Sequence, residues 1–271
     1  MNKYLGLVFM IICMSCSEVP VVLPIGSGPS TGAYTQNVLI EEYTGVRCQN
    51  CPAGAKTLEE LKIIHGERLV IVSIHGGFFA QPPNLENKLR LDNTSGQELI
   101  NIFNQPLGYP SGMINRKVFE SQSSRFLGGN FWAGYVQSEK IKAPALGIEL
   151  DIQHTPAQKQ IRIECDVHGL MDLSGEPLRL SICIVENKIK DAQLTPTGVD
   201  TAYIHNHVLR TFVSSIQGDV LKPIVVNDKK TYTYSATYPT MWNPDQLAIV
   251  AFIHNPGPSY EVIQVVEKKV K

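Results

Sequence analysis

The pair of residues most suited to chemistry in this sequence is Cys48 and Cys51, which are separated by two residues. Cysteines at this C-x-x-C spacing can form a disulfide, exchange it with another thiol, or supply two ligands to a metal ion. Residues 38–43 before them are apolar and β-branched, and residues 52–65 after them have helical periodicity. A cysteine where a helix begins lies among unpaired N–H groups, which favour its thiolate.

Two other residues fall where they would assist a redox pair. Glu42 belongs to the strand that leads to the cysteines, where its carboxylate would accept the proton of the resolving thiol. Pro110 follows a predicted helix and precedes an apolar strand. A cis-proline there would bring backbone beside the sulfurs and offer a partner peptide an edge for pairing.

The elements that must position these residues can be read from the pattern. Residues 69–74 form a nearly continuous apolar run, as expected of a strand buried on both faces, so 38–74 predicts a strand–helix–strand unit. Helices are predicted from Thr94 or Ser95 to about Asn104 and over 131–141. The apolar face of the first helix is expected to carry Ala55, Leu58, Leu61 and either Ile63 or Ile64.

Helical signals nearly vanish after position 143. Six alternating or apolar runs separated by turn residues predict an antiparallel β-sandwich, at 146–152, 160–167, 178–185, 231–236, 247–254 and 260–266. The run 200–212 is interpreted as a strand or a bridging segment. Cys165 and Cys183 fall on two of the runs, and we weigh a disulfide between them against two buried free thiols.

The N-terminal segment has the layout of a lipoprotein signal. Lys3 is followed by an apolar run that is too short to span a bilayer, and then by a small residue and Cys16. This resembles a bacterial lipobox, whose cysteine is diacylated and becomes the mature N-terminus. The alternative is an ordinary cleaved signal. We therefore divide the chain into a signal peptide (1–16), a Pro-, Gly- and Ser-rich tether (17–36), a first domain (37–143) and a β-sandwich domain (144–271).

Composition and missing motifs exclude several classes of function. The net charge is −1, with 24 basic and 25 acidic side chains and no basic cluster, so nucleic acid is not an expected partner. Nucleotide-binding, zinc-protease and serine-hydrolase motifs are absent from the sequence, and we expect no cofactor. Metal is disfavoured because the C-x-x-C pair has no second pair of ligands at a suitable spacing.

The order strand, Glu42, C-x-x-C, helix and then Tyr109-Pro110-Ser111 resembles the thioredoxin-like superfamily over about 37–142. With the lipobox and three further stretches, the whole mature chain resembles the twenty-eight-kilodalton outer-membrane lipoprotein family of Gram-negative bacteria. Those stretches are Val72-Ser73-Ile74-His75, Gly108 to Arg116, and His205-Asn206-His207-Val208-Leu209-Arg210. The resemblance implies a thioredoxin-like domain followed by an immunoglobulin-like β-sandwich, anchored by lipid at the outer membrane.

By that resemblance Cys48 would be the nucleophile, Cys51 the resolver, Glu42 the proton relay and Pro110 the former of the substrate edge. Tyr109, Arg47 and His75 are expected to line the substrate groove, and Arg47 would also favour the thiolate.

Whether the chain is an enzyme stays open at this point. One hypothesis is thiol–disulfide exchange with envelope protein thiols. The other is a non-enzymatic surface adhesin or binding lipoprotein, with a host-surface ligand and a Cys48–Cys51 disulfide that is only structural.

Overall fold

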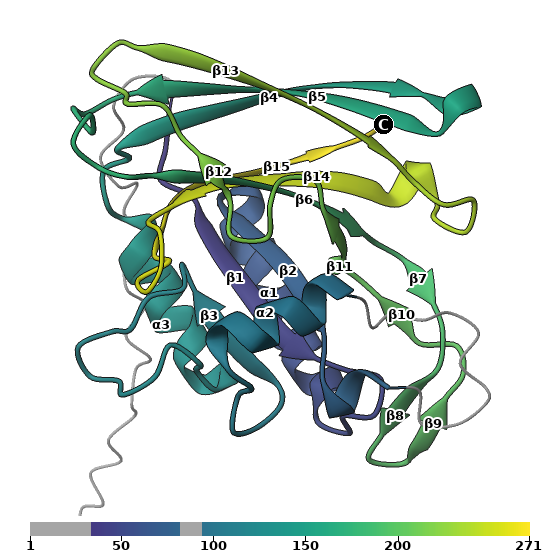
Figure 1. Cartoon of the computed structure of the whole chain (residues 1–271). Coiled ribbons are helices and arrows are strands. Elements are labelled where there is room, and N and C mark those ends of the chain that lie inside the picture. Colours follow the sequence, from purple (N-terminus) through teal and green to yellow (C-terminus); the bar gives the residue numbers. More distant parts are fainter. Residues whose placement is uncertain (1–33, 82–93) are drawn as a thin grey trace, which may run out of the picture.

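A computed structural model describes residues 34–81 and 94–271 of the chain. Its centre is an eight-stranded mixed sheet that runs through both halves of the described chain (Figure 1). From one edge to the other the strands are β3 (Ser111–Ile114), β1 (Val38–Thr44), β2 (Leu69–His75), β11 (Val208–Phe212), β6 (Arg179–Glu186), β14 (Leu247–His254) and β15 (Val262–Lys269), with β12 (Asp219–Val220) beside β6.

The first half confirms the predicted strand–helix–strand unit. Every residue of β1 and β2 is buried, and the two strands pair in parallel. Helices α1 (Cys51–His65) and α3 (Gly129–Lys140) cover one face of these strands, and α2 (Thr94–Phe103) covers the other. Leu58 and Leu61 of α1 are buried as predicted, but Ile63 and Ile64 are exposed, so their assignment to the apolar face was wrong.

The second half contains the predicted antiparallel strands in two packed layers. A three-stranded sheet of β4 (Leu146–Thr155), β5 (Gln160–Gly169) and β13 (Lys229–Thr237) lies over β6, β14 and β15. Strand β6 alternates between the layers because successive side chains of a strand point to opposite faces. Ile182 and Ile184 enter the core with the three-stranded sheet, whereas Cys183 and Val185 join the core around α2.

This alternation decides between the two alternatives for Cys165 and Cys183, a disulfide or two free thiols. Cys165 of β5 faces the core between the two layers, and Cys183 faces the opposite side of the main sheet. Both are buried free thiols in the structure. Two strands near each other in sequence therefore do not bring these sulfurs together.

Strand β11 joins the two halves into one sheet. It pairs antiparallel with β6 and contacts β2 in parallel through Val208 and Ser73. The run 200–212 is thus both a strand and a bridge.

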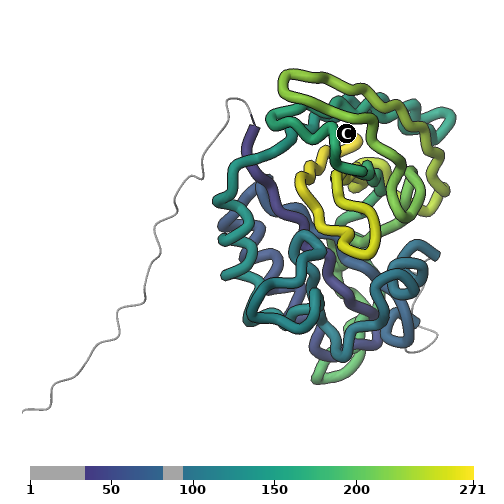
Figure 2. The backbone as a smooth tube through the Cα atoms, turned by 60° about the vertical axis from the view of Figure 1, so that its left-hand side comes forward, coloured from purple at the N-terminus to yellow at the C-terminus, as the bar shows by residue number. Residues whose placement is uncertain are grey.

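Several shorter elements complete the described part of the chain. They are the strands β7 (Ile189–Lys190), β8 (Gln193–Thr195), β9 (Gly198–Asp200) and β10 (Ile204–His205), and the 3₁₀ turns η1 (Gly66–Arg68), η2 (Phe78–Ala80), η3 (Pro156–Gln158) and η4 (Pro244–Gln246). The green β8–β9 hairpin reaches away from the second half to the purple and blue first half in two views (Figure 1, Figure 2).

The residues that lead into β1 are held by the last strand. The Gln36 side chain donates to the carbonyl of Ile263, and the Asn37 side chain donates to that of Val265. Arg68 donates to the Gln36 carbonyl from the other side. The start of β1 is therefore tied to β15 before the strand enters the sheet.

Candidate functional site

Cys48 and Cys51 form a disulfide at the start of α1, with their Cα atoms 5.3 Å apart. The helix begins at Cys51, and Cys48 lies in the turn that precedes it. Asn50, at the N-cap, makes no side-chain capping hydrogen bond. The first turn of α1 therefore presents its N–H groups and the positive end of the helix dipole to the sulfurs.

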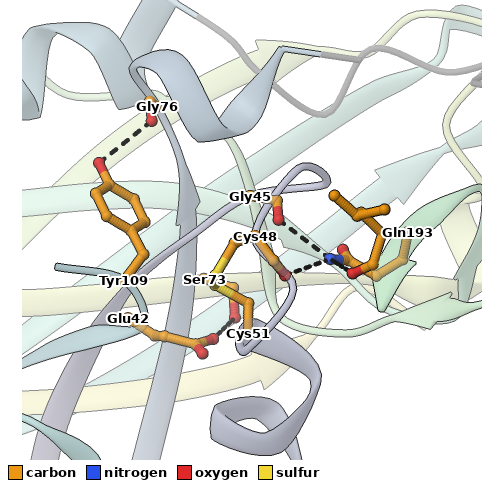
Figure 3. The surroundings of a disulfide bond; sticks show 9 residues. Glu42, Gly45, Cys48, Cys51, Ser73, Gly76, Tyr109 and Gln193 are labelled. Carbon is orange, nitrogen blue, oxygen red and sulfur yellow. Dashed lines mark hydrogen bonds between the residues drawn. A yellow bond between two sulfur atoms is a disulfide. The ribbon is translucent and has the colours of Figure 1, made fainter. Parts of the chain in front are cut away.

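The disulfide is covered by a side chain that sequence reasoning did not find. The Nε2 atom of Gln193, on β8, donates to the carbonyls of Gly45 and Cys48 at 3.2 and 3.0 Å (Figure 3). The Leu194 N–H also donates to the Val46 carbonyl. With this hairpin in place Cys48 is 4% exposed and Cys51 is 2% exposed. No local motif marks Gln193, because the contact joins positions far apart in the sequence.

Glu42 lies on the opposite side of the disulfide, as Figure 3 shows. It pairs in register with Ser73 on the neighbouring strand, so their side chains share a face, and the Ser73 hydroxyl donates to Glu42 Oε2 at 3.1 Å. Glu42 Oε1 has no hydrogen-bond partner among the described residues. Complete burial raises the pKa of Glu42 to about 7, against the Ser73 hydrogen bond, which lowers it.

Pro110 follows a cis peptide bond from Tyr109 and packs against the first turns of α1. A Cβ atom at Gly54 would lie 2.6 Å from Pro110 Cγ and 3.1 Å from Glu42 Oε1. Glycine at position 54 therefore lets the helix, the proline and the carboxyl group meet. The structure brings Glu42, Cys48, Cys51 and Pro110 together as one cluster.

The expected groove residues separate into two places. Tyr109 lies beside the Phe79 ring, with its hydroxyl 3.4 Å from the Gly76 carbonyl, and burial raises its pKa to about 12. Arg47 lies over the Phe78 ring, 4.9 Å from its centroid. These aromatic contacts form one wall near the disulfide.

His75 instead belongs to a separate pocket of about 370 Å³ beside Cys51 and Glu42. We call it the histidine pocket, because His75, His205 and His207 all line it. Burial lowers the pKa of His75 to about 3 and that of His205 to about 4. Tyr203, also missed from the sequence, lines it and contacts the His205 ring edge-to-face.

Metal-binding geometry occurs elsewhere in the described chain. Glu149, Asp166 and His168 place ligand atoms within 4.8 Å of one another on the outer sheet, and Asp166 there pairs with Lys229. No helix in the described ranges is long and apolar enough to cross a membrane. Cys16, the expected lipidation site, lies outside the described residues.

One comparison with known proteins shows the family, and another shows similarity of fold. Residues 97–271 match the family model described as outer membrane protein Omp28. The search of curated proteins found no match.

Among solved structures, HBP35 of Porphyromonas gingivalis is 19% identical, with a TM-score of 0.68 over 88% of this chain and 76% of its own. Protein AGR_C_4864 from Agrobacterium tumefaciens is 10% identical, with a TM-score of 0.56 over 88% and 96% of the two chains. A domain of the outer membrane lipoprotein Omp28 from Porphyromonas gingivalis is 23% identical over 47% of this chain and 89% of its own, with a TM-score of 0.35.

Proposed function

The chain belongs to the Omp28 family of outer membrane proteins, and from that premise we propose that it exchanges thiols and disulfides at the outer membrane through Cys48 and Cys51. The observation that carries the proposal is the cluster of the disulfide, the buried carboxyl group of Glu42 and the cis Tyr109–Pro110 bond at one helix start. A disulfide that serves only as a staple requires neither the acid nor the cis-proline.

The proposed reaction moves two electrons from a substrate dithiol to the Cys48–Cys51 pair. A substrate thiolate attacks Cys48 Sγ, the bond between the two cysteines breaks, and the Cys51 thiolate takes a proton from protonated Glu42. A second substrate thiolate then attacks the substrate sulfur of the mixed disulfide and releases the Cys48 thiolate, which the start of α1 stabilises. In the opposite direction the Glu42 carboxylate removes the Cys51 proton before Cys51 attacks.

We propose a finer fold assignment on the same grounds. The parallel β1–β2 pair, the helix that begins at Cys51 and the cis-proline support a thioredoxin-like unit over 37–143. The two packed antiparallel layers support an immunoglobulin-like unit over 144–271. Membership of an outer membrane family supports lipid anchoring at Cys16.

Two measurements on the purified protein test the exchange. Equilibration with glutathione should give a reduction potential within about −120 to −270 mV, the range of redox enzymes. Cys51→Ser should trap mixed disulfides with envelope proteins, because the attacking Cys48 then has no resolving thiol. Cys48→Ser should trap far fewer, and Cys183→Ser, which alters a buried free thiol on β6, is the matched control. A potential near or below about −300 mV, with no trapped partners, would rule the exchange out.

The second candidate is a binding protein of the cell surface whose disulfide is structural. The burial of both cysteines and the Gln193 cover favour it. This candidate requires a reduction potential near or below about −300 mV. It also requires that binding to a surface ligand persists in the double variant Cys48→Ser/Cys51→Ser. Loss of binding in that double variant, with the fold intact, would count against it.

A further inference from the structure

Most of the buried polar atoms without a partner belong to residues that line the histidine pocket. In the described part of the chain six buried side-chain nitrogen or oxygen atoms make no hydrogen bond, and four of them belong to lining residues of this pocket. They are Glu42 Oε1, His75 Nδ1, His205 Nε2 and His207 Nδ1. Buried polar groups are nearly always satisfied, so a concentration of this kind indicates that the pocket holds something that hydrogen-bonds.

The protonation state of the two buried histidines defines what the pocket requires. Burial lowers the pKa of His75 and of His205, so both rings are neutral. A neutral imidazole has one donor nitrogen and one acceptor nitrogen. The pocket therefore suits a species that both donates and accepts hydrogen bonds, as water does.

A metal ion fits these acceptors poorly. The described residues contain one cluster of three donors within 4.8 Å of one another, and it is the distant group around His168. The side chains of the histidine pocket do not meet that spacing. At roughly 30 Å³ per molecule, a volume of about 370 Å³ has room for about ten waters.

The pocket lies between the buried Glu42 and the half-exposed Glu59, so water in it would connect the two carboxyl groups. Cys51 and Glu42 line it, and Glu42 Oε1 is the unpartnered oxygen of the carboxyl group. Glu59 of α1 also lines it, half-exposed, and accepts from the Asn206 side chain at 3.0 Å. The pocket thus runs from the buried carboxyl group to a solvated one.

We propose that the histidine pocket is a hydrated proton path between Glu42 and solvent, and that His205 is a positioning residue that orders its water. This inference rests on the proposed thiol–disulfide exchange and adds to it a part supplied by the second half of the chain. When Glu42 gives its proton to the Cys51 thiolate, water in the pocket returns one from solvent; in the reverse reaction it carries the proton away. Charged or titratable groups that face the path are Lys56 and Glu59 from α1, His75 from β2, and Tyr203, His205 and His207 from 203–207.

Chemical rescue tests this role. Reduction of the disulfide by dithiothreitol is followed in the full chain by thiol alkylation, across pH, for the wild type and His205→Ala. Loss of an ordered proton path should slow reduction by about tenfold or more, and added imidazole should restore the rate. The equilibrium potential should stay unchanged, because a path alters only the rate. His168→Ala, which removes a histidine far from the disulfide, is the matched control. Its disulfide should be reduced at the wild-type rate, and imidazole should not change that rate.

The outcomes separate the two proposals. If the wild-type disulfide has a reduction potential near or below about −300 mV, both the proposed exchange and this inference are overturned. The proton path alone is overturned if the wild-type reduction potential lies in the range of redox enzymes and a folded His205→Ala reacts at the wild-type rate. It is also overturned if His205→Ala is slowed and imidazole does not restore its rate. If His205→Ala does not fold, His205→Gln keeps a side chain of similar reach, and its solvent isotope effect on reduction should exceed that of the wild type.

Discussion

At the scale of single residues, Glu42 is an acid placed where a charge is costly. Its folded pKa of about 7 lies above its ordinary value of 4.5, because burial disfavours the carboxylate. The protonated form therefore favours folding. Its contribution is fully present below about pH 4.5 and is lost as pH rises through about 7.

This loss of stability with rising pH predicts that Glu42→Gln stabilises the protein at alkaline pH. The gain should be on the order of 3 kcal/mol near pH 8 and close to zero near pH 4, because glutamine mimics the protonated acid. Urea unfolding at several pH values measures it. Glu60→Gln, which removes an exposed pair with Lys56 on α1, is the control and should change stability by less than about 1 kcal/mol. A gain that does not depend on pH would contradict the buried charge as its cause.

At the scale of elements, the β8–β9 hairpin works as a cover for the disulfide loop. Its hold depends on the Gln193 amide, which donates to the carbonyls of Gly45, Cys48 and Leu194. Two of these carbonyls belong to the loop that carries the cysteines. Access to Cys48 is therefore set by an element from the other half of the chain.

Gln193→Ala should loosen this cover. Leaving the buried carbonyls unpaired costs about 1–3 kcal/mol, so reduction of the disulfide by a water-soluble phosphine should accelerate by about tenfold. Gln160→Ala removes an exposed glutamine that bonds Ser235 and should have no effect. An unchanged rate in Gln193→Ala would mean that the hairpin does not limit access.

Elements with local patterns were predictable from the sequence, and contacts between distant segments were not. Strands such as 247–254 were predictable from their apolar runs. The cis-proline and the buried acid were predictable from their positions relative to the cysteines. Gln193 and Tyr203 carry no such pattern, because their roles arise only when the hairpin meets the first half. The choice between a disulfide and free thiols at Cys165 and Cys183 stayed open from the sequence, because the face of each strand depends on which layer it joins.

At the scale of the whole molecule, a buried guanidinium joins the halves. Arg116, after β3, donates to both carboxylate oxygens of Glu41 on β1 at 2.7 and 2.6 Å. Its guanidinium contacts the rings of Phe103 from α2 and Phe252 from β14, 4.9 and 4.8 Å from their centroids. One cation thus contacts the first strand, a covering helix and the second half.

Arg116→Met should destabilise the protein by about 3–5 kcal/mol, because it leaves the Glu41 carboxylate buried and unpaired. Glu41→Leu/Arg116→Met should recover much of that loss, since it removes both charges. Chemical denaturation measures both. Arg162→Met, which breaks an exposed pair with Glu164, should change stability by less than about 1 kcal/mol. Equal destabilisation in the single and double variants would show that the guanidinium acts through packing alone.

The hydrogen bonds that tie Gln36 and Asn37 to β15 have a mechanical consequence. A pull applied to the chain ahead of β1 does not peel that strand from its neighbours first. It loads the hydrogen bonds to Ile263 and Val265, and through them the final strand of the opposite half. Because those bonds lie ahead of the sheet, we expect the load to reach both halves together before it reaches the site at Cys48.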